Sequence, residues 1–538
     1  MDRADTGVRT MRLSYHTRVR TLADTPRVHA ADKGDAIATS FEGRLTTYAE
    51  FDRHASRIAN ALLAAGLKPG DRIAHVGKNS DFYFELLFGC VKAGIVIVPI
   101  TWRLAPPEVA YIVQDSQARL LFVGPEFIEL GRSVARDAPR LEGVVAMEGG
   151  APEWPGFVAW RDAQPDTDPR REGEPDDVIL QLYTSGTTGR PKGAMITHDN
   201  FLAMRRLQDE GSAEWLHWYE DDVGLVAMPN GHIGGTGFGV WVLYYGVKAV
   251  ITREFDPLQV LDMIEQEGVN KFFMVPAALQ FVVRQPRARE VDYSRLRSIY
   301  YGASPIPLAL LQECMEVFKC GFAQMYGLTE TTGTVVALAP EDHDPQGSPR
   351  MRSAGKALSG VEIEILDAQG DPLPPGEIGE IAIRSPANMK GYWNLPEATA
   401  AAMPGNGWFR SGDAGYMDAD GYLYVHDRMK DMIISGGENV YPAEVENAIY
   451  GHPAVSEVAV IGVPSEKWGE EVKAIVAMKP GQSATEAEII AWARERIATF
   501  KTPKSVEFTD ALPRNASGKV LRRTLREPFW AGRERQVQ

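Results

Sequence analysis

Residues 183–193 combine the residue types that bind a polyphosphate. Their sequence is Tyr-Thr-Ser-Gly-Thr-Thr-Gly-Arg-Pro-Lys-Gly. Glycines let backbone N–H groups turn toward one point, hydroxyls add donors, and Lys192 adds a movable positive charge. The run differs from the common P-loop, in which four residues separate the first glycine from a final Gly-Lys-Ser/Thr. The alternative is a glycine-rich surface turn, but the composition favours a phosphate-binding loop formed by Thr184, Ser185, Gly186, Thr187, Thr188, Gly189 and Lys192.

The residues around this loop predict the elements that hold it. The apolar run 178–182 is typical of a buried strand, and residues 200–207 have the spacing of a helix. The loop resembles the signature of the adenylate-forming superfamily, which includes acyl-CoA synthetases, firefly luciferases and the adenylation domains of peptide synthetases. That resemblance implies ATP binding and activation of a carboxylate. Four further motifs match the same superfamily in its usual order.

The first of these motifs is Gln-Met-Tyr-Gly-Leu-Thr-Glu at residues 324–330. Taken alone, it would be read as a turn at the end of a strand with a solvated glutamate. The resemblance implies that Tyr326 stacks on adenine beside the tight turn at Gly327, that Thr329 binds the α-phosphate and that Glu330 binds Mg²⁺. Magnesium takes one or two carboxylates and completes its octahedron with phosphate oxygens and water, so this role is chemically reasonable.

Two motifs follow near the end of the larger predicted domain. Residues 408–413 read Trp-Phe-Arg-Ser-Gly-Asp, and an aspartate after glycine is most often a turn residue. The resemblance implies that Asp413 accepts hydrogen bonds from both ribose hydroxyls. In residues 427–431, Asp-Arg-Met-Lys-Asp, it implies that Arg428 contacts ribose or phosphate and that Lys430 is a hinge. Without the resemblance, these charges would be a solvated linker.

The last two motifs lie in the C-terminal part of the chain. Residues 435–442 contain the pair Gly436 and Gly437, which permits the close backbone approach that a narrow pantetheine channel requires. Residues 513–519 read Pro-Arg-Asn-Ala-Ser-Gly-Lys and match the loop of the family's catalytic lysine. The resemblance implies that Lys519 bridges the reacting carboxylate and the α-phosphate, where an ammonium neutralises developing charge. The alternative is that Lys519 is an ordinary solvated lysine on the surface.

A further segment resembles the family's substrate gate. Residues 228–235 read Met-Pro-Asn-Gly-His-Ile-Gly-Gly, and His232 falls where acyl- and aryl-CoA synthetases carry a histidine. The resemblance gives it a catalytic role, and a structural role is about as well supported by the sequence. Amino-acid-activating relatives place an aspartate near this point. No acidic residue occurs between Asp222 and Arg253, which argues against an amino-acid substrate.

The predicted acid is hydrophobic. Residues 301–307 resemble the version of this stretch in fatty-acyl-CoA synthetases, which implies a nucleotide contact for Ser304. Gly234 and Gly235 leave room where larger side chains would shorten a cavity, whereas Met325 replaces a frequent glycine and makes the wall bulkier. A fatty acid is therefore the first choice and an aromatic acid the second. An apolar run either walls the pocket or fills a helix core: Phe238, Val240, Trp241, Leu243 and Tyr244.

The pattern along the chain predicts a multidomain α/β protein. Helical and strand patterns alternate through residues 55–98 and 249–275, which favours largely parallel sheets in a chain too long for one core. Alternating segments at 361–365 and 380–384 predict antiparallel strands in a small barrel-like part. From Met432 onward a small α+β pattern appears. We expect an N-terminal AMP-binding domain at 1–427 and a mobile C-terminal domain at 428–538 that carries the lysine.

Composition limits the partners and the location. The 538 residues carry a formal net charge of −15, which opposes nonspecific binding to nucleic acid or anionic membrane. The three cysteines lack metal-type spacing with histidines, which fits a reducing compartment. Residues 1–5 lack the apolar core of a signal peptide, and no apolar run approaches a membrane span. A cytoplasmic protein without integral membrane association is expected, with a homodimer left open.

Together the motifs predict an ATP-dependent acid–CoA ligase that uses ATP, Mg²⁺ and coenzyme A. A carboxylate would attack the α-phosphorus of ATP to give an acyl adenylate, and CoA would then give the thioester and AMP. The alternative is an acyl-AMP ligase that transfers the acyl group to a carrier protein instead of CoA. A luciferase-like oxygenase and a nucleotide-binding scaffold without activity are the rivals from other classes. The presence of Lys192, Thr329, Glu330, Asp413 and Lys519 argues against the inactive scaffold.

Overall fold

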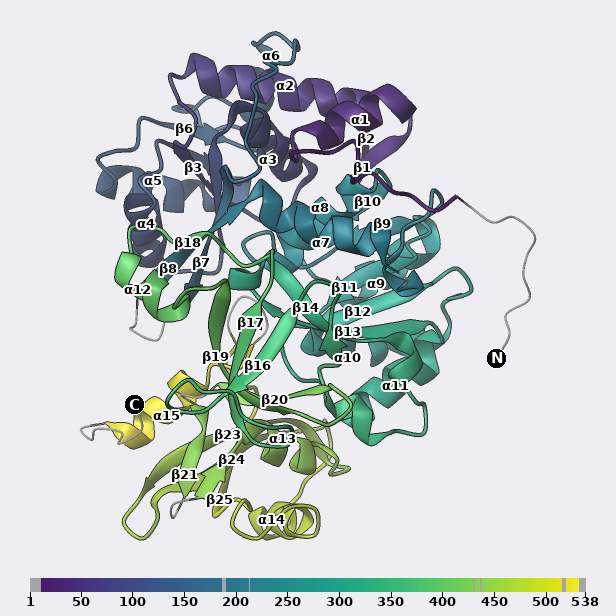
Figure 1. The fold of residues 1–538 in the computed structure, drawn as a ribbon, viewed down its shortest axis with the longest axis vertical. Helices are drawn as coiled ribbons and strands as arrows, with labels where there is room; N and C mark the ends of the chain where they lie inside the picture. The colour runs from purple at the N-terminus through teal and green to yellow at the C-terminus, as the bar shows by residue number, and fades with distance from the viewer. Residues whose placement is uncertain are drawn as a thin grey trace.

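A computed structural model, shown in Figure 1, describes residues 11–185, 190–211, 213–428, 431–435, 438–514 and 519–531. Two large α/β sheets form most of the chain, a small antiparallel sheet follows them, and a separate small α+β domain ends the chain. The predicted fold class is confirmed. Within the described residues, no helix is both long and apolar enough to span a bilayer.

The first large sheet has seven strands, and the five at one end of it are mutually parallel. Its order is β18 (Gly391–Tyr392), β8 (Pro191–Thr197), β7 (Val178–Ser185), β4 (Val96–Ile100), β3 (Arg72–Val76), β5 (Leu120–Val123) and β6 (Gly143–Ala146). The apolar residues of β3, β4 and β5 pack on one face against α4 (Pro106–Asp115) and α5 (Ile128–Asp137).

The second large sheet has nine strands, six of which are mutually parallel. Its order is β15 (Lys356–Ala357), β14 (Gly333–Leu338), β13 (Gly321–Leu328), β12 (Ser298–Gly302), β11 (Lys271–Met274), β9 (Val223–Val226), β10 (Lys248–Ile251), β1 (Ile37–Phe41) and β2 (Arg44–Thr47). Its outer face is covered by α9 (Pro257–Gln266), α10 (Pro276–Val283) and α11 (Leu308–Phe318).

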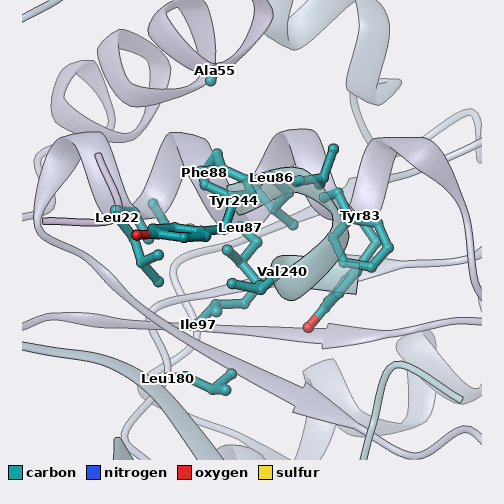
Figure 2. Packing of buried hydrophobic residues seen from close by; sticks show 14 of the residues in the cluster. Leu22, Ala55, Tyr83, Leu86, Leu87, Phe88, Ile97, Leu180, Val240 and Tyr244 are labelled. Atoms are coloured by element: carbon teal, nitrogen blue, oxygen red, sulfur yellow. The ribbon is translucent and has the colours of Figure 1, made fainter. Parts of the chain in front are cut away.

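A layer of helices lies between the two sheets, and its apolar residues form one continuous core with both. The layer contains α1 (Asp24–Lys33), α2 (Tyr48–Ala64), α3 (Asp81–Ala93), α6 (Phe157–Asp162), α7 (His198–Glu210) and α8 (Ile233–Tyr244). Figure 2 shows Val240 and Tyr244 of α8 close to Leu87 of α3 and to Leu22. Every residue of α3 and most residues of α8 are buried, and the two sheets provide that burial for these largely apolar helices.

The helix α3 begins after Ser80 and ends at Gly94, as the sequence predicts. The Ser80 side chain accepts a hydrogen bond from the Tyr83 N–H, and Gly94 ends the helix with φ at 73°. A serine cap is worth about 1 kcal/mol, and a left-handed residue after a helix is most easily supplied by glycine. The helix therefore begins and ends independently of the packing that buries it.

The third sheet and the C-terminal domain are smaller. The antiparallel strands are β16 (Glu362–Leu366), β17 (Gly379–Arg384), β19 (Trp408–Met417) and β20 (Leu423–Arg428), with α12 (Pro396–Ala402) nearby. The last domain contains β21 (Ile433–Ser435), β22 (Glu438–Val440), α13 (Pro442–Tyr450), β23 (Val455–Ser465), β24 (Gly469–Met478), α14 (Glu486–Arg494), β25 (Ser505–Thr509) and α15 (Arg522–Trp530). Short 3₁₀ turns complete the chain: η1 (Pro125–Phe127), η2 (Glu214–Leu216), η3 (Pro286–Arg289), η4 (Thr329–Thr331), η5 (Pro340–Asp342) and η6 (Pro349–Arg352).

The helix predicted at residues 200–207 is confirmed as α7, but strand β8, which was not predicted, begins at Pro191 within the phosphate-binding run and precedes that helix. Strand β8 pairs antiparallel with β7 along most of its length. Pairing with a neighbouring strand supplies the hydrogen bonds that a helix would otherwise make, and sequence pattern alone does not reveal that partner.

Candidate functional site

The phosphate-binding run includes the end of β7 and the start of β8, two strands that pair antiparallel. Thr184 faces Lys192 across the hairpin, and Ser185 faces Pro191. Residues 186–189 and the Ser185 side chain lie outside the described part, so the predicted roles of Ser185, Gly186, Thr187, Thr188 and Gly189 stay predictions. The hairpin nevertheless carries Thr184 and Lys192 to the same end of the sheet.

Glu330, the predicted magnesium ligand, is held by hydroxyl groups from two distant segments. Thr184 Oγ1 and the Tyr392 hydroxyl each donate to Glu330 Oε1, at 3.0 Å in both cases. Glu330 itself lies in η4 and is only 8 % exposed. Two phosphate-site motifs that are far apart in sequence are therefore in direct contact.

Lys192 lies beside the same group. Its ammonium is 5.1 Å from the centre of the Tyr392 ring, which is a favourable cation–π position. Tyr392 thus contacts both Glu330 and Lys192, and sequence reasoning missed it. Tyr392 lies on the two-residue strand β18 and belongs to none of the motifs, so the sequence offered no signal for it.

Tyr326 and Asp413 form the second polar pair. The Tyr326 hydroxyl donates to Asp413 Oδ2 at 2.8 Å, which joins the end of β13 to β19. Asp413 is 6 % exposed, and its own N–H donates to Ser411 Oγ at 3.0 Å. The register places Asp413 opposite Arg428 on β20. The two residues that resemblance assigns to adenine and ribose therefore lie together.

The carboxyl ends of β12 and β13 make the turns on which these side chains sit. A Cβ at Gly302 would lie 2.0 Å from the Met325 carbonyl oxygen, and one at Gly327 would lie 1.8 Å from the Gly333 carbonyl oxygen. Only glycine fits at either position. Ser304 and Thr329 follow these two turns and are both half-buried. Ligand sites in α/β sheets characteristically form at this edge.

His232 lies at the other side of this edge and begins α8. Its carbonyl oxygen accepts from the N–H groups of Gly235 and Thr236, while its Nε2 is buried without a hydrogen-bond partner in the described ranges. Burial, with the nearby charges of Lys519 and Arg103, lowers the pKa of His232 to about 4. The imidazole is therefore neutral at pH 7.

Lys519 comes from the C-terminal domain. An isolated bridge between Arg514 and Val520, together with a hydrogen bond from the Leu521 N–H to the Pro513 carbonyl oxygen at 2.8 Å, closes the loop that precedes it. Lys519 is exposed and lies near enough for its charge to lower the pKa of His232. Residues 287 positions apart in sequence are thus brought to one site.

A cavity of about 180 Å³ lies beside this gate. Its polar lining includes Arg103, Arg253 and Arg514, and its apolar lining includes Met228 and Phe281. Arg253 also pairs with Glu42 and Glu148, both at 2.7 Å, and Arg514 pairs with Glu457 at 2.9 Å. The N-terminal and C-terminal domains therefore both line the cavity.

Some predicted residues cannot be placed. Residues 429–430 and 436–437 lie outside the described ranges, and so does the Arg428 side chain, so the roles of Arg428, Lys430, Gly436 and Gly437 stay predictions. In the ranges that are described, no group of three or more His, Cys, Asp or Glu side chains forms a metal site. A magnesium ion at Glu330 would need oxygen ligands from the nucleotide, as the sequence suggested.

Comparison with known proteins decides the family. A family model described as AMP-binding enzyme matches residues 27–393, and its C-terminal domain model matches residues 444–519. The chain belongs to the AMP-binding enzyme family. The prediction of the adenylate-forming superfamily and of an acid–thiol ligase class is thereby confirmed.

Individual members of the family show how broad it is. The chain is 43 % identical to the fatty acid–[acyl-carrier-protein] ligase ScoC of Streptomyces coeruleorubidus, over 97 % of this chain and 99 % of the relative. It is 42 % identical to a feruloyl-CoA synthase of Amycolatopsis sp, over 94 % and 99 %. The crystal structure of the anthranilate CoA ligase AuaEII with anthranoyl-AMP superposes with a TM-score of 0.87 at 29 % identity, covering 95 % of this chain and 97 % of that one.

Proposed function

We propose that this protein is an ATP-dependent acid–CoA ligase that activates a hydrophobic carboxylic acid as its acyl adenylate. The observation that carries the proposal is that Lys519, from the C-terminal domain, lies near enough to His232 at the gate for its charge to lower the pKa of that imidazole. Nearby, the described hydroxyl, carboxylate and ammonium groups of the phosphate and ribose motifs lie at one sheet edge. A scaffold without activity has no need for a lysine in that position.

In the first half-reaction, a carboxylate oxygen bonds to the α-phosphorus of ATP while the bond to pyrophosphate breaks. Lys519 would lie between the carboxylate and the α-phosphate and offset the growing negative charge. Lys192 and Thr184 would contact the leaving phosphates from the hairpin, and Thr329 would donate to the α-phosphate. Asp413 would accept from the ribose hydroxyls while Tyr326 fixes its orientation.

Magnesium would bind at Glu330. When bound, this ion supplies positive charge to the phosphate oxygens and keeps water in its remaining positions. Glu330 fits the role because its carboxylate is oriented by two hydroxyls that donate to the same oxygen, Oε1. Neutral donors orient a carboxylate toward a cation without competing with that cation for charge.

In the second half-reaction, the sulfur of a thiolate bonds to the acyl carbon, and AMP leaves with the electrons of the broken carbon–oxygen bond. Coenzyme A would approach through the cavity lined by Arg103 and Arg514, whose guanidinium groups suit phosphate. Gly436 and Gly437 would line the pantetheine path after the C-terminal domain turns about Lys430. A carrier protein remains the alternative acceptor, because ScoC is named for that acceptor.

The acid would lie along α8. Phe238, Trp241 and Tyr300 contact one another edge-on or tilted, with ring centres 5.2 to 6.3 Å apart. The proposed acid is hydrophobic, with a fatty acid as the first choice and an aromatic acid as the second, although these three rings are themselves buried in the core. They also partly answer the question left by the sequence, because the apolar run of α8 is largely buried core.

The deciding experiment is a panel of fatty and aromatic acids assayed for acid-dependent pyrophosphate release and for AMP. Release with ATP that depends on one class of acid supports the proposal, and release without any acid would contradict it. Free CoA and a phosphopantetheinyl carrier protein are then compared as acceptors of the same adenylate. Thioester on the carrier alone would replace the CoA-ligase proposal with a carrier-loading one, and light emission or oxygen uptake would indicate the oxygenase.

A further inference from the structure

A second and much smaller cavity lies between α7 and α8. Its volume of about 10 Å³ is close to that needed for a single water molecule. Most of its lining is apolar, as expected between two core helices: Leu22, Phe201, Leu202, Gly237 and Val240. Three side chains with polar groups also line it, and all three can donate hydrogen bonds: Arg205, Trp241 and Tyr244.

Two of these donors are buried and lack an acceptor. Trp241 is 5 % exposed and Tyr244 is 1 % exposed, and neither Trp241 Nε1 nor the Tyr244 hydroxyl has a hydrogen-bond partner in the described parts of the chain. Buried polar groups are nearly always paired, and leaving one unpaired costs about 1–3 kcal/mol. Two such groups on one small cavity indicate a missing acceptor.

The third group brings positive charge. The Arg205 guanidinium lies 4.6 Å from the Trp241 ring centre and donates to Gln208 Oε1 at 2.7 Å. Arg205 has no ion pair among the described side chains, and burial lowers its pKa. Asp209 is the carboxylate one turn along α7, but it accepts from Tyr245 at 2.6 Å and from the Tyr15 N–H at 3.2 Å. Arg205 therefore suits an anion that the protein does not supply.

One face of α8, between the gate and this cavity, is less buried than the rest of the helix. On the otherwise buried helix α8, Ile233, Gly234 and Gly237 keep partial exposure, and they share one face. A Cβ at Gly237 would lie 3.3 Å from Ile233 Cδ1 and 4.0 Å from Phe201, so a larger residue at this position would crowd this face of the helix. From His232 to Trp241 the helix rises roughly 13 Å, which is within the length of a medium-sized acid.

We infer that Arg205, Trp241 and Tyr244 bind an anionic, hydrogen-bond-accepting oxygen group, such as a second carboxylate, at the end of the acid opposite the one that is activated. The inference rests on the proposed ligase function and names the substrate class more closely. The chain of the acid would lie along the apolar face of α8, while its two polar ends meet Lys519 and Arg205. A water molecule would satisfy two donors but would leave the guanidinium charge without a counter-ion.

The test compares straight-chain monocarboxylic acids with dicarboxylic acids of equal length, using kcat/KM for pyrophosphate release. In the wild type, the dicarboxylic acid should be preferred at one chain length. Arg205→Met keeps length and removes the charge, so that preference should fall about 10–100-fold, as expected for a hydrogen bond to a charged group. Tyr244→Phe removes only the hydroxyl and should lower the preference about tenfold or less.

A neighbouring arginine supplies the matched control. Arg206 is next in sequence and pairs with Asp199 outside the cavity, so Arg206→Met should leave the ratio of the two acids unchanged. Rates with the monocarboxylic acid show whether each variant is folded and active, and Tyr244→Phe serves if Arg205→Met does not fold.

The possible outcomes separate the two proposals. If monocarboxylic acids are activated but no dicarboxylic acid is preferred at any length, the cavity holds water only and the inference is overturned. The same conclusion follows if Arg205→Met leaves a wild-type preference intact. If the wild type activates no acid of any kind, the proposed ligase function itself fails, and the inference fails with it.

Discussion

The side of the site proposed to bind the nucleotide and the side proposed to bind the acid differ in whether their buried polar atoms have hydrogen-bond partners. On the nucleotide side, Glu330 and Asp413 accept hydrogen bonds of 2.8–3.0 Å from Thr184, Tyr392 and Tyr326. Along α8, buried polar atoms of His232, Trp241 and Tyr244 have no partner in the described residues. On the proposed assignments, the side chains of the nucleotide side would be oriented before ATP arrives, whereas the polar atoms of the acyl side would be paired only when the substrate is bound.

The largest expected effect is at Lys519, which the C-terminal domain brings near His232. Lys519→Ala should slow acid-dependent pyrophosphate release about 10²–10³-fold, because it removes one charged donor from the transition state. Reaction of CoA with a supplied acyl adenylate should remain nearly normal. Equal losses in the two half-reactions would contradict a role confined to adenylation.

A variant at Lys430, the proposed hinge, tests whether one orientation of the C-terminal domain is enough for both half-reactions. Lys430→Pro fixes φ and removes a backbone donor, so it should hold the domain near the adenylating orientation. In single-turnover measurements, adenylate should form at close to the normal rate while thioester formation falls sharply. If both half-reactions kept wild-type rates, the hinge would have to lie elsewhere.

On the nucleotide side, Glu330→Gln preserves shape and removes charge. It should raise the Mg²⁺ concentration for half-maximal activity at least about tenfold, since changes near a metal commonly cost 10–100-fold in affinity. The hydroxyls of Thr184 and Tyr392 can still donate to the amide oxygen, so folding should be little changed. An unaltered magnesium requirement with full activity would rule out the assignment.

On the acyl side, His232 should make the protein sensitive to acid. Its pKa is lowered to about 4 in the folded protein, against about 6.5 when unfolded, so the unfolded state binds the proton first as pH falls. The stability that neutral His232 allows is complete above pH 6.5 and is lost between about pH 6.5 and 4. The free energy of unfolding, measured with urea, should therefore fall between pH 7.5 and pH 5, and this fall should be about 1–2 kcal/mol smaller in His232→Gln than in wild type. An identical fall in both proteins would show that His232 is protonated in the folded state.

The smallest effect is expected at Tyr326. Tyr326→Phe removes the hydroxyl that orients Asp413 but keeps the ring, so the KM for ATP should rise about three- to tenfold. The KM for the acid should not change, because the pair belongs to the nucleotide side. A larger change in the KM for the acid than in the KM for ATP would contradict the assignment of this pair to the nucleotide side.

Features that depend on neighbouring residues were predictable from the sequence. The serine cap and glycine end of α3, the strand that precedes the phosphate loop and the alternating strands β16 and β17 all follow from local pattern. The motifs predicted the family for the same reason, since each is a short run that makes its own turn. Strand β8 was missed because its partner β7, and not its own pattern, decides its conformation.

The contacts that make the site were decided only by the tertiary structure. Thr184 donates a hydrogen bond to Glu330, and Lys519 lies near His232. Both follow because sheet order and domain packing bring distant turns to one edge. Tyr392 and Arg205 carry no motif, so nothing in their own neighbourhood indicates that one joins the phosphate site and the other faces a cavity. Short-range chemistry determines turns and helix ends, whereas a binding site is a juxtaposition of distant segments, which only the packing of the sheets and helices fixes.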